Sequence, residues 1–140
     1  MLYRVSPPLR AASSLEGVYG DGWTGPAVAY TRFAASPNAP GRLRVNLSRS
    51  AWRGPDVPGR VRLRIGPLVV KNGVPSIGRV TAEREWVVHS GASRTFVLPT
   101  PAPPFRFELT TPTFSPANFG QADTRRLGVQ ASFRFLPQRG

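Results

Sequence analysis

Short segments of alternating apolar and polar residues, bounded by proline and glycine, restrict the fold of this chain more than any other feature. The clearest is R-L-R-V-N-L-S-R at 42–49, where the two leucines and the valine would share one face. R-V-R-L-R-I at 60–65 and F-R-F-E-L at 105–109 repeat the pattern. Because successive side chains of a strand point to opposite faces, each segment predicts a strand with one buried face.

Helical patterns are nearly missing, and the 16 prolines recur too often for long helices. Lys71-Asn72-Gly73 supplies a hairpin turn. Further strand candidates are 27–33, 68–70, 78–88, 94–98 and 127–136. About eight strands without crossover helices predict an all-β protein, an antiparallel β-sandwich of jelly-roll type. A closed barrel is the alternative, because period-two patterns cannot separate the two.

The length of 140 residues predicts a single domain, with a core at about 17–137 and a lead-in at 1–16. A hydrophobic content of 40% excludes wholesale disorder. No run reaches the roughly 18 apolar residues of a membrane-spanning helix. The first residues are also too short and too polar for a secretory signal.

The chain is strongly basic, with 19 Lys+Arg against 7 Asp+Glu, and Lys71 is its only lysine. This charge predicts attraction to polyanions, including anionic lipid headgroups and acidic glycans. Several arginines take the outward positions of expected strands: Arg42, Arg44, Arg60, Arg62, Arg64 and Arg106. They are either ordinary solvated faces or one contiguous cationic face. Nucleic acid is disfavoured as a partner, because the strand aromatics share the apolar register.

Residues for catalysis are scarce. The chain has no cysteine, and His89 is its only histidine, which argues against a structural zinc site. No nucleophile-elbow, phosphate-binding or dinucleotide-binding motif occurs. The seven acids are expected to pair mainly with arginines. We therefore expect no enzymatic activity, no cofactor and no metal.

Two loops contain the remaining unusual residues. G-V-Y-G-D-G-W-T-G at 17–25 holds Asp21 and Trp23 between glycines. The segment 114–128, F-S-P-A-N-F-G-Q-A-D-T-R-R-L-G, combines one acid, two arginines and internal apolar residues. Its composition predicts a packed corner between two strands.

In this order and separation, D-G-W-T-G near the start and D-T-R-R-L-G before the last strand resemble a known family. It is the small β-sandwich domain appended to polytopic bacterial membrane glycosyltransferases of the lipid-phosphosugar-dependent type, in its actinobacterial-style version. The resemblance covers roughly Gly17 to Pro137. It implies a non-catalytic, extracytoplasmic module in cell-envelope polysaccharide or lipid-linked glycan assembly. Such a module would hold a glycan or lipid-linked sugar, or dock onto a partner such as a membrane glycosyltransferase portion.

Sugar rings present C–H faces to aromatic planes and hydroxyls to polar side chains. The candidate ligand-binding residues are Tyr19, Trp23 and Trp52 for the planes, and Asp21, Asn118, Asp123 and Arg125 for the polar contacts. A structural role is the alternative. Trp23 would then plug the end of the sandwich, and Asp123 would pair with a nearby arginine or accept backbone N–H bonds.

Three functions follow from the sequence. The first is a carbohydrate-associated accessory domain without catalysis, located in the cell envelope. The second is a structural or interaction module that docks through an arginine-rich face on a protein partner or an anionic membrane. A polyanion or nucleic-acid binder is the third and weakest.

Overall fold

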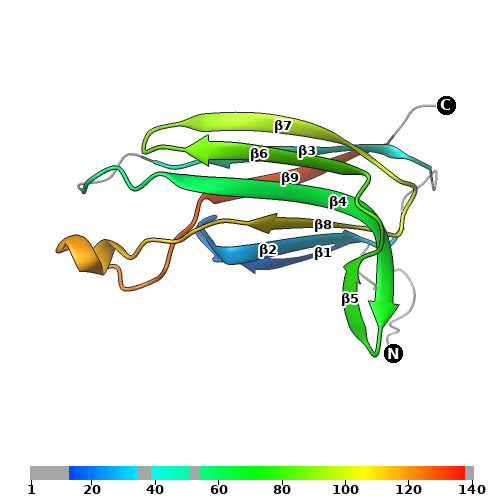
Figure 1. The fold of residues 1–140 in the computed structure, drawn as a ribbon, viewed down its shortest axis with the longest axis horizontal. Helices are drawn as coiled ribbons and strands as arrows, with labels where there is room; N and C mark the ends of the chain where they lie inside the picture. Colours follow the sequence, from blue (N-terminus) through cyan, green and yellow to red (C-terminus); the bar gives the residue numbers. More distant parts are fainter. Residues whose placement is uncertain (1–12, 35–38, 51–53, 138–140) are drawn as a thin grey trace, which may run out of the picture.

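The computed structural model describes residues 13–34, 39–50 and 54–137, which form nine strands in two antiparallel sheets (Figure 1). The six-stranded sheet has the order β1-β2-β8-β4-β5, with β6 also beside β4: β1 (Ser13–Val18), β2 (Thr24–Arg32), β4 (Gly59–Lys71), β5 (Val74–Ile77), β6 (Ala82–Val88) and β8 (Phe105–Thr110). The three-stranded sheet has the order β7 (Ser93–Thr100), β3 (Gly41–Ser48), β9 (Gln130–Pro137). The predicted all-β antiparallel sandwich is confirmed. The ladders form two separate sheets, so the alternative of a closed barrel is wrong.

The core lies between the sheets and follows from the alternation in the sequence. Along β3 every second residue is buried, from Leu43 to Leu47. The first half of β4 and the whole of β8 show the same pattern. The core side chains are Val28, Tyr30, Leu43, Val45, Leu47, Val61, Leu63, Ile65, Val88, Phe96, Leu98, Phe105, Phe107, Leu109 and Val129.

Aromatic side chains connect the two sheets across this core. Phe133 of β9 stacks on Tyr30 of β2, with ring centroids 5.8 Å apart, and meets Phe107 of β8 edge-on at 5.4 Å. Phe135 packs on Phe105 at 5.6 Å. Such pairs contribute about 0.5–1.5 kcal/mol each beyond their burial. The last strand is therefore fixed to the opposite sheet by its aromatic residues.

The N-terminal boundary differs from the expectation. The sequence placed residues 1–16 before the core, but β1 begins at Ser13 and pairs antiparallel with β2, Ser13 opposite Arg32. All of β1 is at least partly exposed, because it is an edge strand with neither face buried. It therefore has no alternating pattern that could reveal it.

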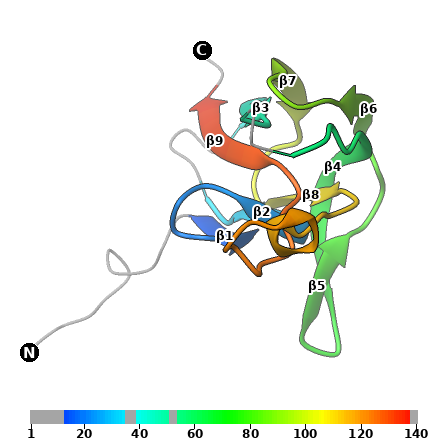
Figure 2. The ribbon, with the colours of Figure 1, turned by 90° about the vertical axis from the view of Figure 1, so that its left-hand side faces the viewer.

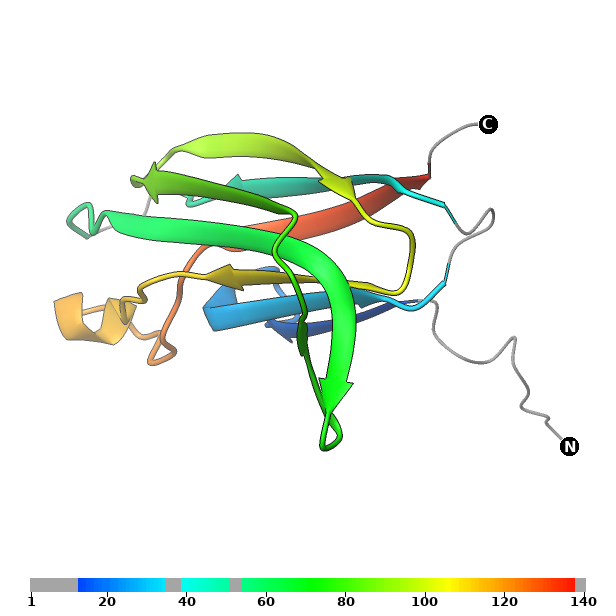
Figure 3. The same ribbon diagram turned by 45° about the vertical axis from the view of Figure 1, so that its right-hand side comes forward.

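The expected strand at 78–88 is also divided differently. The regular ladder of β6 begins at Ala82, and β5 precedes it as the second arm of a hairpin with β4. This hairpin projects from the body of the sandwich (Figure 3). Its turn is the predicted Asn-Gly pair, with Asn72 at φ 53° and Gly73 at φ 77°. Positive φ at both positions is what a type I′ turn requires.

The segment 111–129 joins β8 to β9 and forms the expected packed corner. Phe114 and Leu127 are buried and exchange two backbone hydrogen bonds of 2.9 and 2.7 Å. A short 3₁₀ helix, η2 (Pro116–Phe119), lies between them and protrudes at one end of the sandwich (Figures 1 and 2). The prediction of a packed corner is confirmed.

Candidate functional site

The two loops at 17–25 and 114–128 meet in the fold, where residues 21–25 lie antiparallel beside residues 127–131. The Thr24 N–H donates to the Val129 carbonyl at 2.7 Å, and the Gly128 N–H donates to the Thr24 carbonyl at 2.8 Å. We call these paired segments, together with Tyr19 and 123–125, the clasp. The clasp joins the start of β2 in one sheet to the start of β9 in the other.

Arg125 is the centre of the clasp's charged part. Its two terminal nitrogens contact the two carboxylate oxygens of Asp21 at 3.2 and 2.8 Å. The same guanidinium contacts Asp123 through Nη2 at 2.8 Å and Nε at 3.1 Å. Its Cζ lies 4.9 Å from the centroid of the Tyr19 ring, a cation–π distance. Two acids that lie far apart in the sequence therefore share one arginine.

This arrangement fixes the protonation of all three groups. The Arg125 guanidinium lowers the pKa of Asp21 and of Asp123 below their usual values, and the Arg125 backbone N–H lowers that of Asp123 further. The two carboxylates in turn raise the pKa of Arg125. Both acids are therefore ionised at neutral pH, where neither can serve as a general acid.

Close packing holds the uncharged part of the clasp together. The Thr24 side chain is fully buried, and its Oγ1 donates to the Gly25 carbonyl at 2.9 Å and accepts the Val129 N–H at 3.2 Å. A Cβ on Gly128 would lie 2.7 Å from Thr24 Oγ1 and 2.9 Å from the Gly25 carbonyl. Thr24 and Gly25 of the first motif therefore leave no room for a side chain at Gly128 of the second motif. The two motifs are therefore in direct contact in the fold.

Arg49 hydrogen-bonds to the backbone of the clasp. It is only 2% exposed, and its Nε and Nη2 donate to the Gly128 carbonyl at 3.1 and 2.7 Å. Its Nη1 donates to the Val57 carbonyl, and its Cζ lies 5.0 Å from the Phe114 ring centroid. Burial lowers the pKa of Arg49, and the charge of Asp56 opposes this effect. The side chain thus connects the loop between β3 and β4 to the segment between β8 and β9.

Trp23 packs within this end of the molecule. Its ring meets Phe114 edge-on, with centroids 6.0 Å apart, and its backbone pairs with Gln130. The Trp23 N–H donates to Asp21 at 3.3 Å. These contacts support the interpretation that Trp23 plugs the sandwich.

The structure thus groups four of the sequence-predicted ligand residues: Tyr19, Asp21, Asp123 and Arg125. Trp23 lies next to them but packs on Phe114. Asn118 is exposed on η2, where its N–H donates to the Ser115 carbonyl at 3.0 Å. Trp52 lies outside the described residues. The grouped charges bind one another, which supports the structural alternative for this loop.

A hollow that the sequence analysis missed lies over one end of the three-stranded sheet. Its volume is about 560 Å³. Six outward side chains with hydroxyl or amide groups line it: Asn46, Ser48, Ser93, Thr95, Gln130 and Ser132. Their strands are distant in the sequence, but the register places Thr95, Asn46 and Ser132 in one row across the sheet.

This row is hydrogen-bonded internally. Thr95 Oγ1 donates to Asn46 Oδ1 at 2.7 Å, and Asn46 Nδ2 contacts Ser132 Oγ at 3.4 Å. Each residue alone is an ordinary outward strand position. The sequence does show that the three segments 41–48, 93–100 and 130–137 contain no acidic residue. It does not show that their polar side chains share one face of a sheet.

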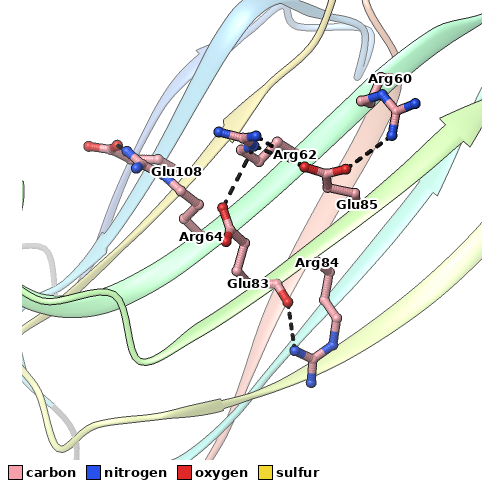
Figure 4. A network of polar contacts seen from close by, with 7 residues as sticks. All are labelled: Arg60, Arg62, Arg64, Glu83, Arg84, Glu85 and Glu108. Atoms are coloured by element: carbon pink, nitrogen blue, oxygen red, sulfur yellow. Dashed lines mark hydrogen bonds and ion pairs between the residues drawn. The ribbon is translucent and has the colours of Figure 1, made fainter.

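The outward arginines do not form one contiguous face. Arg60, Arg62 and Arg64 lie on the six-stranded sheet, where Glu83, Glu85 and Glu108 pair with them (Figure 4). Arg106 lies on the same sheet and pairs with Glu108. The Arg106 side chain is only 12% exposed, so it is not solvated as expected. Arg42 and Arg44 lie on the other sheet. The alternative of a single cationic face across all six is therefore wrong.

The only histidine pairs with an acid. His89 Nδ1 lies 2.6 Å from Asp56 Oδ2, and the Ser90 N–H donates to Asp56 Oδ1 at 2.8 Å. The Ser90 N–H and the His89 contact lower the pKa of Asp56. Within the described residues no serine hydroxyl hydrogen-bonds to His89. The pair connects the loop before β4 to the turn between β6 and β7.

Comparison of the chain with protein-family models, curated proteins and solved structures found no match. In the part of the chain that the structure describes, no three acidic or histidine side chains gather in a way that could hold a metal ion. No helix among those residues is both long enough and apolar enough to span a bilayer. The resemblance to glycosyltransferase-associated domains therefore depends on the sequence motifs.

Proposed function

We propose that this chain is a non-catalytic, carbohydrate-associated accessory domain of the cell envelope. It binds or positions a glycan, or the sugar of a lipid-linked intermediate, beside a membrane glycosyltransferase. The observation that carries the proposal is the hollow over the three-stranded sheet, with its six hydroxyl and amide side chains.

The chemistry of these side chains suits a sugar. Hydroxyl and amide groups both donate and accept hydrogen bonds, as sugar hydroxyls do. The bonds among Thr95, Asn46 and Ser132 hold the three groups in place before a ligand arrives. Preorganisation of this kind reduces the entropic cost of binding.

The clasp supports the absence of catalysis in this proposal. Asp21 and Asp123 are the two acids of the sequence motifs, and both are ion-paired with Arg125. A pair of acids for glycoside cleavage needs one carboxyl that is protonated near neutral pH. The lowered pKa values of Asp21 and Asp123 oppose that role.

A binding titration with a variant in the middle of the polar row tests this proposal. The wild-type protein is screened on an array of bacterial envelope glycans, and the bound glycans are titrated by calorimetry. Asn46→Ala removes the bonds to both Thr95 and Ser132, so we expect affinity to fall by roughly tenfold or more.

Thr110→Ala is the matched control, since it truncates an exposed polar side chain on β8 of the other sheet. It should bind as the wild type does, and both variants should unfold at similar temperatures because both positions are exposed. No binding of the wild type to any glycan on the array, or equal binding by Asn46→Ala, would reject the proposal.

A second candidate is an interaction module that docks through arginines on a protein partner or an anionic membrane. The observation that favours it is the distribution of charge. The arginines of the three-stranded sheet have no acidic residue on their own three strands, whereas four arginines of the other sheet are paired with glutamates: Arg60, Arg62, Arg64 and Arg106.

A further inference from the structure

The outer face of the three-stranded sheet has two chemically different halves. The rows Ser93–Ser48–Gln130 and Thr95–Asn46–Ser132 form the polar half, which lines the hollow. The rows Val97–Arg44–Arg134 and Pro99–Arg42–Leu136 form the cationic half. Neighbouring rows lie about 7 Å apart, the rise of two residues along a strand. A ligand longer than one sugar ring in the hollow therefore reaches the arginines.

No acid compensates the cationic half. The strands β3, β7 and β9 carry four arginines and no aspartate or glutamate. None of the carboxylates in the described residues forms an ion pair with Arg42, Arg44 or Arg134, all of which are exposed. On the other sheet, three glutamates neutralise a comparable set of arginines (Figure 4). The cationic half is therefore a cluster of three exposed arginines without acidic partners.

Arg44 and Arg134 stand directly opposite each other on neighbouring strands. Like charges in this position destabilise a sheet, because the Cβ atoms are only about 5 Å apart. An anion between the two guanidinium groups would remove the repulsion. Guanidinium forks match the geometry of carboxylate and phosphate groups, so either group suits the pair.

We infer that the ligand is an acidic glycan, with uncharged rings in the polar half and anionic substituents on Arg44 and Arg134. The inference rests on the proposed function and specifies the class of its ligand. It also accounts for a feature that a neutral glycan leaves unexplained, the exposed pair of like charges one row from the hollow.

The same face could attract an anionic membrane, but its polar half argues for a glycan. A membrane-docking surface gains affinity from basic and apolar side chains together. Here the polar half carries hydroxyl and amide groups that hydrogen-bond to neighbouring side chains. Those groups match a polyhydroxylated ligand.

The test uses an array on which each acidic envelope polysaccharide stands beside its own backbone stripped of charge, by carboxyl reduction or by dephosphorylation. Wild-type protein is expected to prefer the charged member of a pair, and the preference should shrink as salt rises from about 50 to 200 mM. Arg44→Gln with Arg134→Gln should bind the charged member roughly tenfold more weakly and the neutral member unchanged.

Arg60→Gln with Arg84→Gln is the matched control. It removes the same net charge from exposed positions on the other sheet and should keep the preference. Equal binding of charged and neutral members by the wild type overturns the inference and leaves the proposed function intact. Binding to neither member of any pair overturns both. Binding only to vesicles that contain anionic lipid overturns the inference in favour of membrane docking.

Discussion

Arg49 occupies a position that is rare for arginine, because charged side chains are seldom fully buried without an ionic partner. Its partners in this protein are carbonyl oxygens. Two of its nitrogens donate to Gly128, and a third donates to Val57. Gly128 also packs so closely against Thr24 that a Cβ would not fit between them. The hydrogen bonds of Arg49 therefore fix the backbone where the clasp is most tightly packed.

Arg49→Met tests this role at the scale of one residue. Methionine keeps most of the aliphatic volume but leaves the carbonyls of Gly128 and Val57 without their donors. A buried acceptor without a partner costs about 1–3 kcal/mol, and the Gly128 carbonyl is buried whereas that of Val57 is only partly buried, so we expect the free energy of unfolding to fall by about 1–3 kcal/mol. Urea denaturation measures the change.

The control for this substitution is Arg60→Met, on the exposed side of β4, where the side chain is 66% exposed. It should change the stability little, because surface ion pairs contribute little. Equal stability of Arg49→Met and the wild type would show that the buried hydrogen bonds of Arg49 have no net effect.

At the scale of elements, the hairpin of β4 and β5 differs from the rest of the sandwich. β4 passes from the sheet into the hairpin at Gly66, where a Cβ would lie 2.8 Å from Ile77 Cγ2. Beyond this point Val70 and Val74 are 59% and 63% exposed. A two-stranded hairpin with so little burial is only marginally stable in water.

Hydrogen exchange should resolve this difference. We expect the paired amides of β5 to exchange at least roughly 100-fold faster than those of Leu43 and Val45 in β3, because local opening of the hairpin costs less than global unfolding. β3 is paired on both sides and its inward residues are fully buried, so its amides serve as the internal reference. Equal protection of β5 and β3 would mean that another surface covers the hairpin in solution.

At the scale of the whole molecule, the two sheets divide the charge unequally, and the clasp joins them at one end. On the six-stranded sheet, Glu83, Glu85 and Glu108 pair with Arg60, Arg62, Arg64 and Arg106. The three-stranded sheet leaves its arginines unpaired among the described residues. The formal charge of +12 therefore includes one compact group of unpaired arginines, Arg42, Arg44 and Arg134, on the outer face of the three-stranded sheet.

The clasp makes the free energy of unfolding of the whole fold depend on pH. The folded-state pKa values of Asp21 and Asp123 are lowered, so their contribution is present above the unfolded pKa of about 4. It is lost as the pH falls through the lower folded values. Arg125→Met removes the largest cause of each shift, the side-chain bonds of Arg125, and keeps the backbone N–H bonds to both acids. We expect the wild type to be the more stable protein at pH 6, and the difference to shrink as the pH falls below about 4.

Urea denaturation of both proteins across this pH range measures the difference. The lowered pKa values of Asp56 and Glu85 affect both proteins alike and cancel in the comparison. A gap that stays constant from pH 6 to the acid limit would show that Arg125 acts through packing and not through its charge.

Local alternation was sufficient to predict the strands that bury one face, such as β3, β8 and the first half of β4. It missed β1, whose faces are both exposed, and it merged 78–81 with β6 because those residues already lie beside β4. The Gly78 N–H donates to the Pro67 carbonyl at 2.9 Å, and the Thr81 N–H to the Ile65 carbonyl at 2.8 Å. Edge strands and irregular pairing carry little periodic signal.

The candidate site was only partly predictable for a related reason. The sequence selected Asp21, Asp123 and Arg125 by their unusual setting between glycines, but it could not pair residues 104 positions apart. The polar hollow depends on register alone. Asn46, Thr95 and Ser132 become neighbours only when three strands from different parts of the chain are aligned.

The late position of β9 has a consequence for the order of folding. Phe133 and Phe135 cover Tyr30, Phe105 and Phe107 only after the chain has been synthesised through β9, the last of the described strands. A nascent chain that ends at β8 therefore exposes three large aromatic rings and one unpaired edge of β3. Such surfaces promote aggregation. We therefore expect folding to be completed slowly, in a step that follows the synthesis of β9 and requires the closure of a long loop.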